Sequence, residues 1–406
     1  MDFATHLEKL HSFLLPYHAL MDTEVLALSL DSFEKLYPCA FLDALEQISL
    51  SDLRRLEGRE IPSSLQNSEL KSFFTKCFEY ADDIPSSPKT YSYTFVTKEW
   101  DGINPKKQHE LSCLFSFLTS KTLPAQIIEI GGGLGHLSQV FSKKLNLPCV
   151  SLDQDLVLQN KGRSKKNSLV AYLCANLPLS SYNHIPALND HLLIGLHTCG
   201  DLVKSQIEMA LNMKALSFLN LGCCYHKTHD TLSALLPSDW IKNNNQITLS
   251  SDAKTLACRS HTLPKEADFH FKIRLKKFRY TFQLFLREHF SLHEITKLGP
   301  STPMLYAGEF ADYAQEQLRR INKNLPWITS EILQSFFDDT QRQRQVYRMI
   351  LAGIMRQALG RPLELFIILS RAQYLAEQGY ECQVTTCFDE TISPRNLCIY
   401  GIRPSA

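Results

Sequence analysis

The chain has 406 residues, of which 44% are hydrophobic, 21% charged and 10% aromatic. This composition provides for a sizeable core and excludes global disorder. The length is about two to three times that of a typical domain, so we expect more than one unit. Lys and Arg number 43 against 42 Asp and Glu, a net charge of +1. A globally basic surface for nucleic acid is thereby excluded, whereas a local basic patch is not.

The beginning of the chain and its cysteines indicate a compartment. Residues 1–30 are interrupted by charged residues and proline, so we expect no secretory leader. No run approaches the roughly 18 uncharged apolar residues of a membrane span. The twelve cysteines are therefore expected to be free thiols in a reducing compartment. We expect a cytoplasmic or nuclear protein with no membrane partner.

Residues 1–95 are predicted to form an N-terminal helical region, as in FLDALEQISLSDL at 41–53. The Pro- and Ser-rich sequence IPSSP at 84–88 indicates the boundary that follows it. Between residues 96 and 260, short apolar strands alternate with helical segments, a pattern typical of a parallel sheet with helices on both faces. The predicted strands are residues 127–130, 149–153, 169–174, 192–196 and 216–221.

After residue 260 the alternation stops, and residues 261–350 are predicted to form a helical insertion. Residues 351–406 are expected to return to the sheet with a helix over 363–378 and a closing strand pair over 381–388 and 397–402. The predicted fold is therefore α/β. It has a Rossmann-like sheet, an N-terminal helical domain and a helical insertion.

A glycine-rich loop follows the first predicted strand, in the sequence IIEIGGGLGH at 127–136. Glycines at positions 131, 133 and 135 permit positive φ angles and let a ligand approach the backbone. The helix that follows offers unpaired N–H groups and its positive dipole end. A dinucleotide site would require glycine at 136, where His136 stands instead.

The pattern E-x-G-x-G-x-G resembles motif I of class I methyltransferases that use S-adenosylmethionine (AdoMet). The resemblance implies a class I methyltransferase sheet, AdoMet as cofactor, and a carboxylate near its methionine end. An acid that ends the second strand suits the ribose hydroxyls, and an amide after the third strand suits the adenine. A tight turn that binds no ligand is the alternative. The predicted cofactor-binding residues are Glu129, Gly131, Gly133, Gly135, Asp153 and Asn176.

Two further predicted strand ends carry HTCGD at 197–201 and GCCYHK at 222–227. Ligands bind at the carboxyl ends of parallel strands, so we expect these residues to face the cofactor cleft. A histidine here suits a base or an orienting hydrogen-bonding group, because histidine titrates near neutrality. Buried thiols that only pack are one alternative. Zinc is another, but the His and Cys pairs are spaced one apart on extended ends, and no metal site is predicted. The candidate catalytic residues are His197, Cys199, Cys223, Cys224 and His226.

These segments resemble a known family. LLIGLHTCGDL and LNLGCCYHK are similar to the methyltransferase-like protein 25 family of AdoMet-dependent methyltransferases, as are NPKKQHE at 104–110 and SPRN at 393–396. A partial likeness extends to tRNA 2′-O-methyltransferases with a Cys-Cys-His-His motif, which Tyr225 interrupts here. The resemblance implies methyl transfer, with RNA as one candidate partner.

Basic residues in two places are candidates for substrate binding. The two lysines of NPKKQHE suit a cofactor carboxylate or a substrate phosphate. Residues 271–287 contain six Lys and Arg and no acid, beside an apolar stripe from Phe271 to Phe285. We expect the stripe to dock and to leave the cations outside, as a phosphate-binding or simply a solvated face. The predicted substrate-binding residues are Lys106, Lys107, Lys272, Lys276 and Arg279.

The sequence thus predicts an AdoMet-dependent methyltransferase whose acceptor it does not identify. The basic segment slightly favours RNA. The neutral net charge favours a protein or a small molecule. A catalytically silent AdoMet-binding scaffold is the third interpretation, because no diagnostic catalytic motif is complete. The sequence identifies no protein partner.

Overall fold

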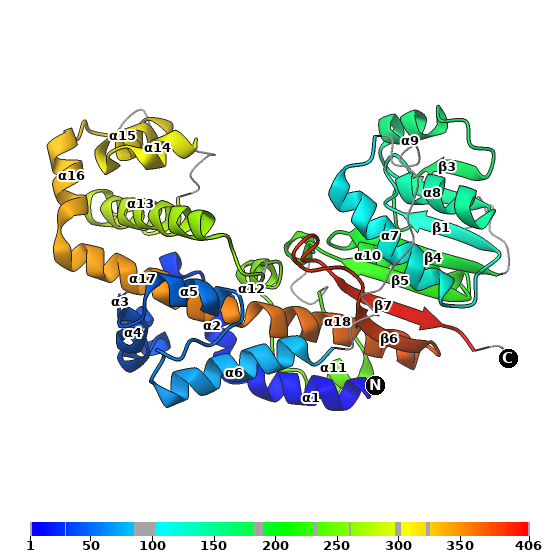
Figure 1. The fold of residues 1–406 in the computed structure, drawn as a ribbon, viewed down its shortest axis with the longest axis horizontal. Helices are drawn as coiled ribbons and strands as arrows, with labels where there is room; N and C mark the ends of the chain where they lie inside the picture. Colours follow the sequence, from blue (N-terminus) through cyan, green and yellow to red (C-terminus); the bar gives the residue numbers. More distant parts are fainter. Residues whose placement is uncertain are drawn as a thin grey trace. The chain divides into compact units, whose positions relative to one another are not determined.

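The computed structural model divides into two compact units, whose elements are labelled in Figure 1. Unit 1 comprises Met1–His18, Glu79–Ser260 and Gly360–Ala406, and unit 2 comprises Ala19–Phe78 and His261–Leu359. Among the described residues, no helix is both long and apolar enough to cross a membrane. The structure describes residues 2–28, 30–84, 102–179, 181, 185, 190–229, 234–259, 261–296, 302–321 and 325–404.

Unit 1 is built on a sheet that has seven strands among the described residues, in the order β3-β2-β1-β4-β5-β7-β6. The first five of these strands are parallel, and β7 is antiparallel to both of its neighbours. The predicted α/β sheet and its closing strand pair are confirmed. The strands are β1 (Gln126–Ile130), β2 (Cys149–Asp153), β3 (Val170–Cys174), β4 (His191–Thr198), β5 (Ser217–Gly222), β6 (Glu381–Thr386) and β7 (Leu397–Ile402).

The central strands are apolar on both faces, as a sheet covered by helices on both sides requires. Ile128 of β1 pairs with Val150 of β2 on one side and with Leu193 of β4 on the other. The strand order reverses at β1, and at such a switch point an open α/β sheet is expected to form a ligand crevice beyond the carboxyl ends of its strands. Every residue singled out by the glycine-rich and His-Cys motifs lies at this edge or just beyond it.

Helices cover both faces of the sheet (Figure 1). One face shares an apolar cluster with α7 and α8, whereas Gly195 of β4 faces Gln206 of α10 on the other. The helix α18 packs on β6 and β7, and α1 packs along α18. The helices of unit 1 are α1 (Phe3–Leu14), η1 (Leu15–Tyr17), α7 (Pro105–Thr119), α8 (His136–Leu145), α9 (Leu156–Arg163), α10 (Leu202–Asn212), η4 (Tyr225–Lys227), α11 (Asp239–Asn244), α12 (Ser251–Leu256) and α18 (Gly360–Glu377).

The described part of unit 2 is helical, and the long helix α13 packs against α17 at its centre. Polar contacts join its two chain segments, because the guanidinium of Arg348 in α17 donates to the carboxylate of Glu46 in α4. The helices within unit 2 are η2 (Val25–Ala27), α3 (Leu30–Leu36), α4 (Cys39–Glu46), α5 (Leu50–Glu57), α13 (Glu266–Phe290), α14 (Pro303–Ala307), α15 (Phe310–Ile321), α16 (Ser330–Asp338) and α17 (Thr340–Ala358). The helices α2 (His18–Asp22) and α6 (Ser68–Asp82) cross the unit boundaries.

The units differ from the predicted domains. The region 1–95 is divided between the units, because buried leucines of α1 pack on α18, which belongs to unit 1. The helical insertion extends to Leu359 rather than ending at 350, since α17 continues to Ala358. The predicted boundary between 95 and 96 lies outside the described residues.

The stretch 41–53, expected to be helical, contains parts of two helices, α4 and α5. Ser49 separates them, because its side chain accepts a hydrogen bond from the backbone N–H of Asp52 at 3.0 Å and caps the start of α5.

Candidate active site

The glycine-rich loop joins β1 to α8 at the crevice edge of the sheet. Gly131, Gly133 and Gly135 have φ angles of 69°, 55° and 68°, in the region that favours glycine. A Cβ added at Gly133 would meet only Leu158 within 4 Å, at 3.6 Å. One added at Gly135 would lie 2.8 Å from the ring of Tyr172. Gly133 therefore borders space that a ligand can enter, whereas packing requires Gly135.

Two residues that the sequence analysis missed hold this loop in place. A Cβ at Gly132 would lie 2.3 Å from Ser151 Oγ, so only glycine fits there. The buried side-chain amide of Gln159 donates to the carbonyl of Gly133 at 2.8 Å. Gly132 lies between the alternate glycines of the motif, and Gln159 belongs to no motif, so neither residue was predicted.

Asp153 ends β2 directly beside the loop. Its Oδ2 accepts a hydrogen bond from Gly133 N, and its Oδ1 accepts one from Asp155 N, both at 2.8 Å. Each carboxylate oxygen keeps a further lone pair, so these bonds are compatible with the predicted ribose contact. Asn176 is exposed two residues beyond β3, and the preceding Ala175 N donates to Asp153 O at 3.0 Å. The ribose and adenine roles stay predictions.

Glu129 is buried beneath the loop. Its Oε2 accepts from Ser138 N at 3.1 Å and from Ser138 Oγ at 2.6 Å, which ties β1 to the first turn of α8. Burial raises the pKa of Glu129, and the hydrogen bonds from Ser138 and the charge of Lys107 reduce that rise. Its predicted position near the methionine end of the cofactor stays a prediction.

His136 opens α8 and carries a buried Nδ1 with no hydrogen-bond partner among the residues that the structure describes. Burial, with the charges of Lys165 and Lys107, lowers the pKa of His136 to about 4. The ring is therefore neutral at physiological pH. A polar atom without a partner at the mouth of a glycine-rich loop fits a ligand-binding position.

A His–Glu pair lies at the end of β4. His197 has a φ of 64° at a bulge in the strand, and its Nε2 lies 2.7 Å from Glu110 Oε1 in α7. Ser393 Oγ donates to the same oxygen at 2.7 Å, and Lys106 Nζ lies 3.7 Å from it. Glu110 is buried, and its contact with Nε2 fixes the orientation of the His197 ring.

The charge state of Glu110 determines which nitrogen of His197 is protonated. Burial would raise the pKa of Glu110, but hydrogen bonds from His197 and Ser393 and the charge of Lys107 outweigh it and leave the pKa below its usual value. An ionised carboxylate only accepts, so His197 Nε2 carries the hydrogen and Nδ1 is left as an acceptor. Glu110 and Ser393 lie inside the family-like segments NPKKQHE and SPRN, and this position is the sequence signal that could have identified them as site residues.

The thiols of Cys199, Cys223 and Cys224 converge at the ends of β4 and β5. The Sγ–Sγ distance is 3.1 Å between Cys199 and Cys223 and 3.5 Å between Cys223 and Cys224, and all three atoms lie within 4.8 Å of one another. The hydrogen bond from Cys223 lowers the pKa of Cys199 to about 5. The same bond and burial raise the pKa of Cys223.

His226 lies apart from these three thiols. It is exposed, and its Nδ1 lies 3.5 Å from the Sγ of Cys258, whose thiol donates to Cys223 O at 3.2 Å. The structure thus places the predicted catalytic residues in three groups. His197 pairs with Glu110, three thiols contact one another, and His226 pairs with Cys258. Their catalytic roles stay predictions.

The predicted substrate lysines of α7 lie on its first turn. Lys106 is half-exposed beside Glu110. Lys107 is partly buried, and burial lowers its pKa while Glu129 and Glu110 oppose this effect. Both cations therefore lie close to the carboxylates beneath the crevice, in unit 1.

Arg274 of α13 is exposed as expected, but other cations of this helix have partners within unit 2. Lys272 Nζ lies 2.6 and 2.8 Å from the carboxylate oxygens of buried Glu57, and Arg279 Nε donates to Tyr306 Oη at 3.0 Å. Lys276 Nζ would lie 3.5 Å from a Cβ added at Gly353. Phe271, expected in the docked stripe, is 39% exposed. The helices α5, α14 and α17 pack around α13, so these cations contact residues within unit 2.

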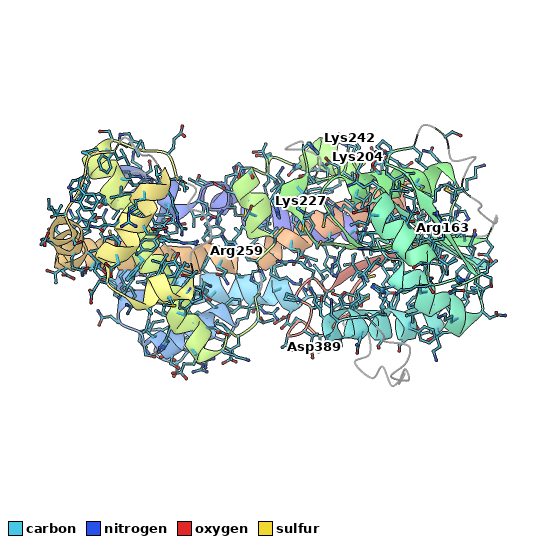
Figure 2. All side chains as sticks on the ribbon, turned by 90° about the horizontal axis from the view of Figure 1, so that it is seen from above. Arg163, Lys204, Lys227, Lys242, Arg259 and Asp389 are labelled. Carbon is cyan, nitrogen blue, oxygen red and sulfur yellow. The ribbon has the colours of Figure 1, made fainter. Side chains whose placement is uncertain are left out.

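Exposed cations do occur in unit 1 near the thiols. Lys227 immediately follows His226, and Lys204 is exposed on α10. Figure 2 shows Lys204, Lys227 and Lys242 toward one side of this unit and Asp389 toward the other. The sequence analysis singled out none of these three lysines, which come from separate segments, and Lys242 pairs with Asp239 at 3.2 Å.

Comparison with known proteins assigns a class to this region. Residues 106–231 match a family described as a methyltransferase domain. The match extends from the first turn of α7 to the segment after β5 and includes the glycine-rich loop, Asp153, the His197–Glu110 pair and the three thiols. This part of the chain is similar to a methyltransferase domain, which agrees with the predicted class I sheet and with AdoMet as cofactor.

Curated relatives are more specific. The chain is 22% identical over 274 residues to "Probable methyltransferase-like protein 25" of Homo sapiens, covering 60% of this chain and 43% of the relative. The protein of the same name from Mus musculus is 21% identical over 266 residues, covering 59% and 42%. The predicted likeness to methyltransferase-like protein 25 is confirmed. The chain spans less than half the length of these relatives.

Solved structures of methyltransferases also match. The plantazolicin methyltransferase BpumL in complex with SAH is 12% identical with a TM-score of 0.24, covering 69% of this chain and 95% of that one. Coclaurine N-methyltransferase bound to N-methylheliamine and SAH is 11% identical with a TM-score of 0.27, covering 89% and 98%.

Proposed function

We propose that this chain is an AdoMet-dependent methyltransferase. The observation that carries the proposal is the glycine-rich loop. Its backbone is held by Asp153 and Gln159, and a Cβ added at Gly133 would meet only the Leu158 side chain, at the edge where the strand order reverses. The methyltransferase-domain match over residues 106–231 supports the same function.

The residues present fit the cofactor. A ligand of this shape needs close approach to the backbone, which Gly133 permits, and an acceptor for ribose hydroxyls, which the remaining lone pairs of Asp153 offer. Bound AdoMet would supply a methyl group already activated on its sulfonium. The chain then has to align an acceptor and remove its proton.

His197 is the residue best arranged to take that proton. Glu110 holds Nε2–H, so Nδ1 has a free lone pair. AdoMet held by the glycine-rich loop and Asp153 would supply the methyl group for an acceptor O or N. The acceptor proton passes to His197 Nδ1 and afterwards to solvent. Glu110 stabilises the imidazolium and is a positioning residue.

Two measurements test the activity. Titration calorimetry with AdoMet measures cofactor binding, and tritiated methyl transfer into fractionated cellular RNA and protein measures catalysis. We expect binding and transfer in the wild type, and binding without transfer in His197→Asn. A chain that binds AdoMet but labels no RNA, protein or small-molecule fraction is a silent scaffold. Absence of AdoMet binding would contradict the whole proposal.

RNA is the acceptor class we favour, because Lys204 and Lys227 are exposed in the unit that carries the loop. Such cations suit a phosphate backbone. We expect Lys227→Glu to reduce RNA labelling while AdoMet affinity is unchanged. Lys143→Glu, the same charge change at an exposed site of α8, is the matched control. Label that enters protein or small molecules instead would show that the acceptor is not RNA.

A further inference from the structure

We infer that Cys199, Cys223 and Cys224 bind one soft metal ion, Zn²⁺, through three thiolates. The sulfurs come from the ends of two neighbouring strands and lie within 4.8 Å of one another. A zinc ion with bonds of about 2.3 Å to sulfur would hold its thiolates about 3.8 Å apart in tetrahedral geometry. The observed separations of 3.1 and 3.5 Å are close to that spacing, so the ion requires only a small outward movement.

The turn of the chain makes this convergence possible. A spacing of one residue puts neighbouring side chains on an extended strand too far apart for one ion, which was the argument against zinc from sequence. In the structure, β4 ends in a bulge at His197 and a positive φ of 59° at Gly200. Beyond β5, the chain turns into the short helix η4. Neither end is extended where the thiols lie.

The two loops are also locked against each other. Gly200 N donates to Cys224 O at 3.2 Å, and Lys227 N donates to the same carbonyl at 3.1 Å. A Cβ added at Gly200 would lie 2.6 Å from Lys227 O. The backbone is therefore fixed before an ion arrives, which lowers the ordering cost of binding. The nearby ammonium of Lys227 offsets the net negative charge of a tris-thiolate zinc centre.

Among the residues that the structure describes, no fourth ligand joins the three thiols, so one coordination position stays open. Cys258 and His226 contact each other rather than completing the trio. Three protein ligands with an open fourth position are typical of zinc sites that exchange a water or bind a substrate atom. On binding, the thiols that are still protonated lose their protons to solvent and three Zn–S bonds form, with no change of oxidation state. This inference does not depend on the proposed methyl transfer.

Metal content and sulfur coordination test the inference on the full chain. We expect about one zinc per chain after anaerobic purification, and three sulfur neighbours by X-ray absorption. Exchange with Co²⁺ should produce sulfur-to-cobalt charge-transfer absorption. Cys199→Ser, Cys223→Ser and Cys224→Ser should each lose the metal. Cys258→Ser and the exposed control Cys39→Ser should retain it.

Removing the metal from the wild type distinguishes loss of a metal ligand from unfolding of a variant. A chelator should remove its zinc, and added Zn²⁺ or Co²⁺ should restore one equivalent with the chain folded by circular dichroism. A folded wild type that takes up no Co²⁺ with sulfur bands overturns the inference. So does uptake that Cys223→Ser leaves unchanged, or a Cys199–Cys223 disulfide found by mass spectrometry after anaerobic purification.

Discussion

His197 Nε2 lies 2.7 Å from Glu110 Oε1, although 87 residues separate the two in the sequence. The contact joins the first turns of α7 to the bulged end of β4, and both residues fall within the segment that matches a methyltransferase domain. It gives one ring nitrogen a fixed hydrogen and leaves the other free. The pair therefore orients the ring that we propose as the base, at the same edge of the sheet as the predicted cofactor loop.

Glu110→Gln should reduce methyl transfer by about 100-fold, the lower end of the usual range for general base catalysis. The amide keeps the shape of the carboxylate but no longer stabilises the imidazolium. We expect AdoMet affinity to be unchanged and the pH–rate profile to shift, which a merely structural role would not produce. Steady-state kinetics and calorimetry measure the two effects. Glu381→Gln, an exposed change on β6, is the control and should behave as wild type.

Glu110 should also make stability depend on pH in acid. Its pKa in the folded chain lies below the usual value, so its stabilising contribution is complete above the unfolded pKa of about 4.3 and is lost as the pH falls through the folded pKa. The free energy of unfolding of wild type minus that of Glu110→Gln should thus fall on acidification below about pH 5. Urea unfolding at a series of pH values measures it. A difference that is constant with pH would show that Glu110 is not the titrating group.

Gly133→Arg should abolish AdoMet binding, because the arginine side chain would occupy the space through which the cofactor is proposed to approach the backbone. Positive φ adds a strain of about 1–2 kcal/mol. Gly379→Arg is a matched control, since Gly379 also has a positive φ, of 87°, and no neighbour within 4 Å of an added Cβ. We expect similar losses of thermal stability in both variants and loss of calorimetric AdoMet binding in Gly133→Arg alone. Equal AdoMet affinity in the two would refute the placement of the cofactor at this loop.

Asp153→Ala should weaken AdoMet by about 1.5–3 kcal/mol, the range for hydrogen bonds to a charged group. The carboxylate holds Gly133 N and Asp155 N and is predicted to accept from the ribose. Asp153→Asn keeps one acceptor oxygen and should lose less. The affinity for adenosine should fall in parallel with the affinity for AdoMet, as measured by competition. Unchanged adenosine affinity in Asp153→Ala would show that Asp153 does not contact the ribose.

The sheet was predictable from sequence because its strands are short, its central strands are apolar on both faces, and its parallel strands are separated by gaps long enough for crossover connections. The bounds of β2 and β7 match the predicted strands, and the glycine-rich loop lies where its motif placed it. Local periodicity and turn chemistry determine these features, so they need no knowledge of distant contacts.

The rest depended on tertiary contacts that no single segment encodes. The Glu110–His197 pair joins a helix to a strand far along the chain. The convergence of three thiols depends on turns at two strand ends. The cations of α13 looked solvated because buried Glu57, the partner of Lys272, lies 215 residues away in the sequence. The division of residues 1–95 between the units depends in the same way on α18.

The order of strands has a consequence for folding during synthesis. The inner strand β5 pairs with β7, as in Ser217 with Ile402, so its outer edge has no partner until the last strands leave the ribosome. Most of unit 2 emerges in the interval, between β5 and α18. An apolar strand that the folded sheet buries can template aggregation while one of its edges is unpaired. The late pairing of this edge with β7 also makes folding slow. Nascent chains stalled before β7 should therefore depend on chaperones, and those extended past it should not.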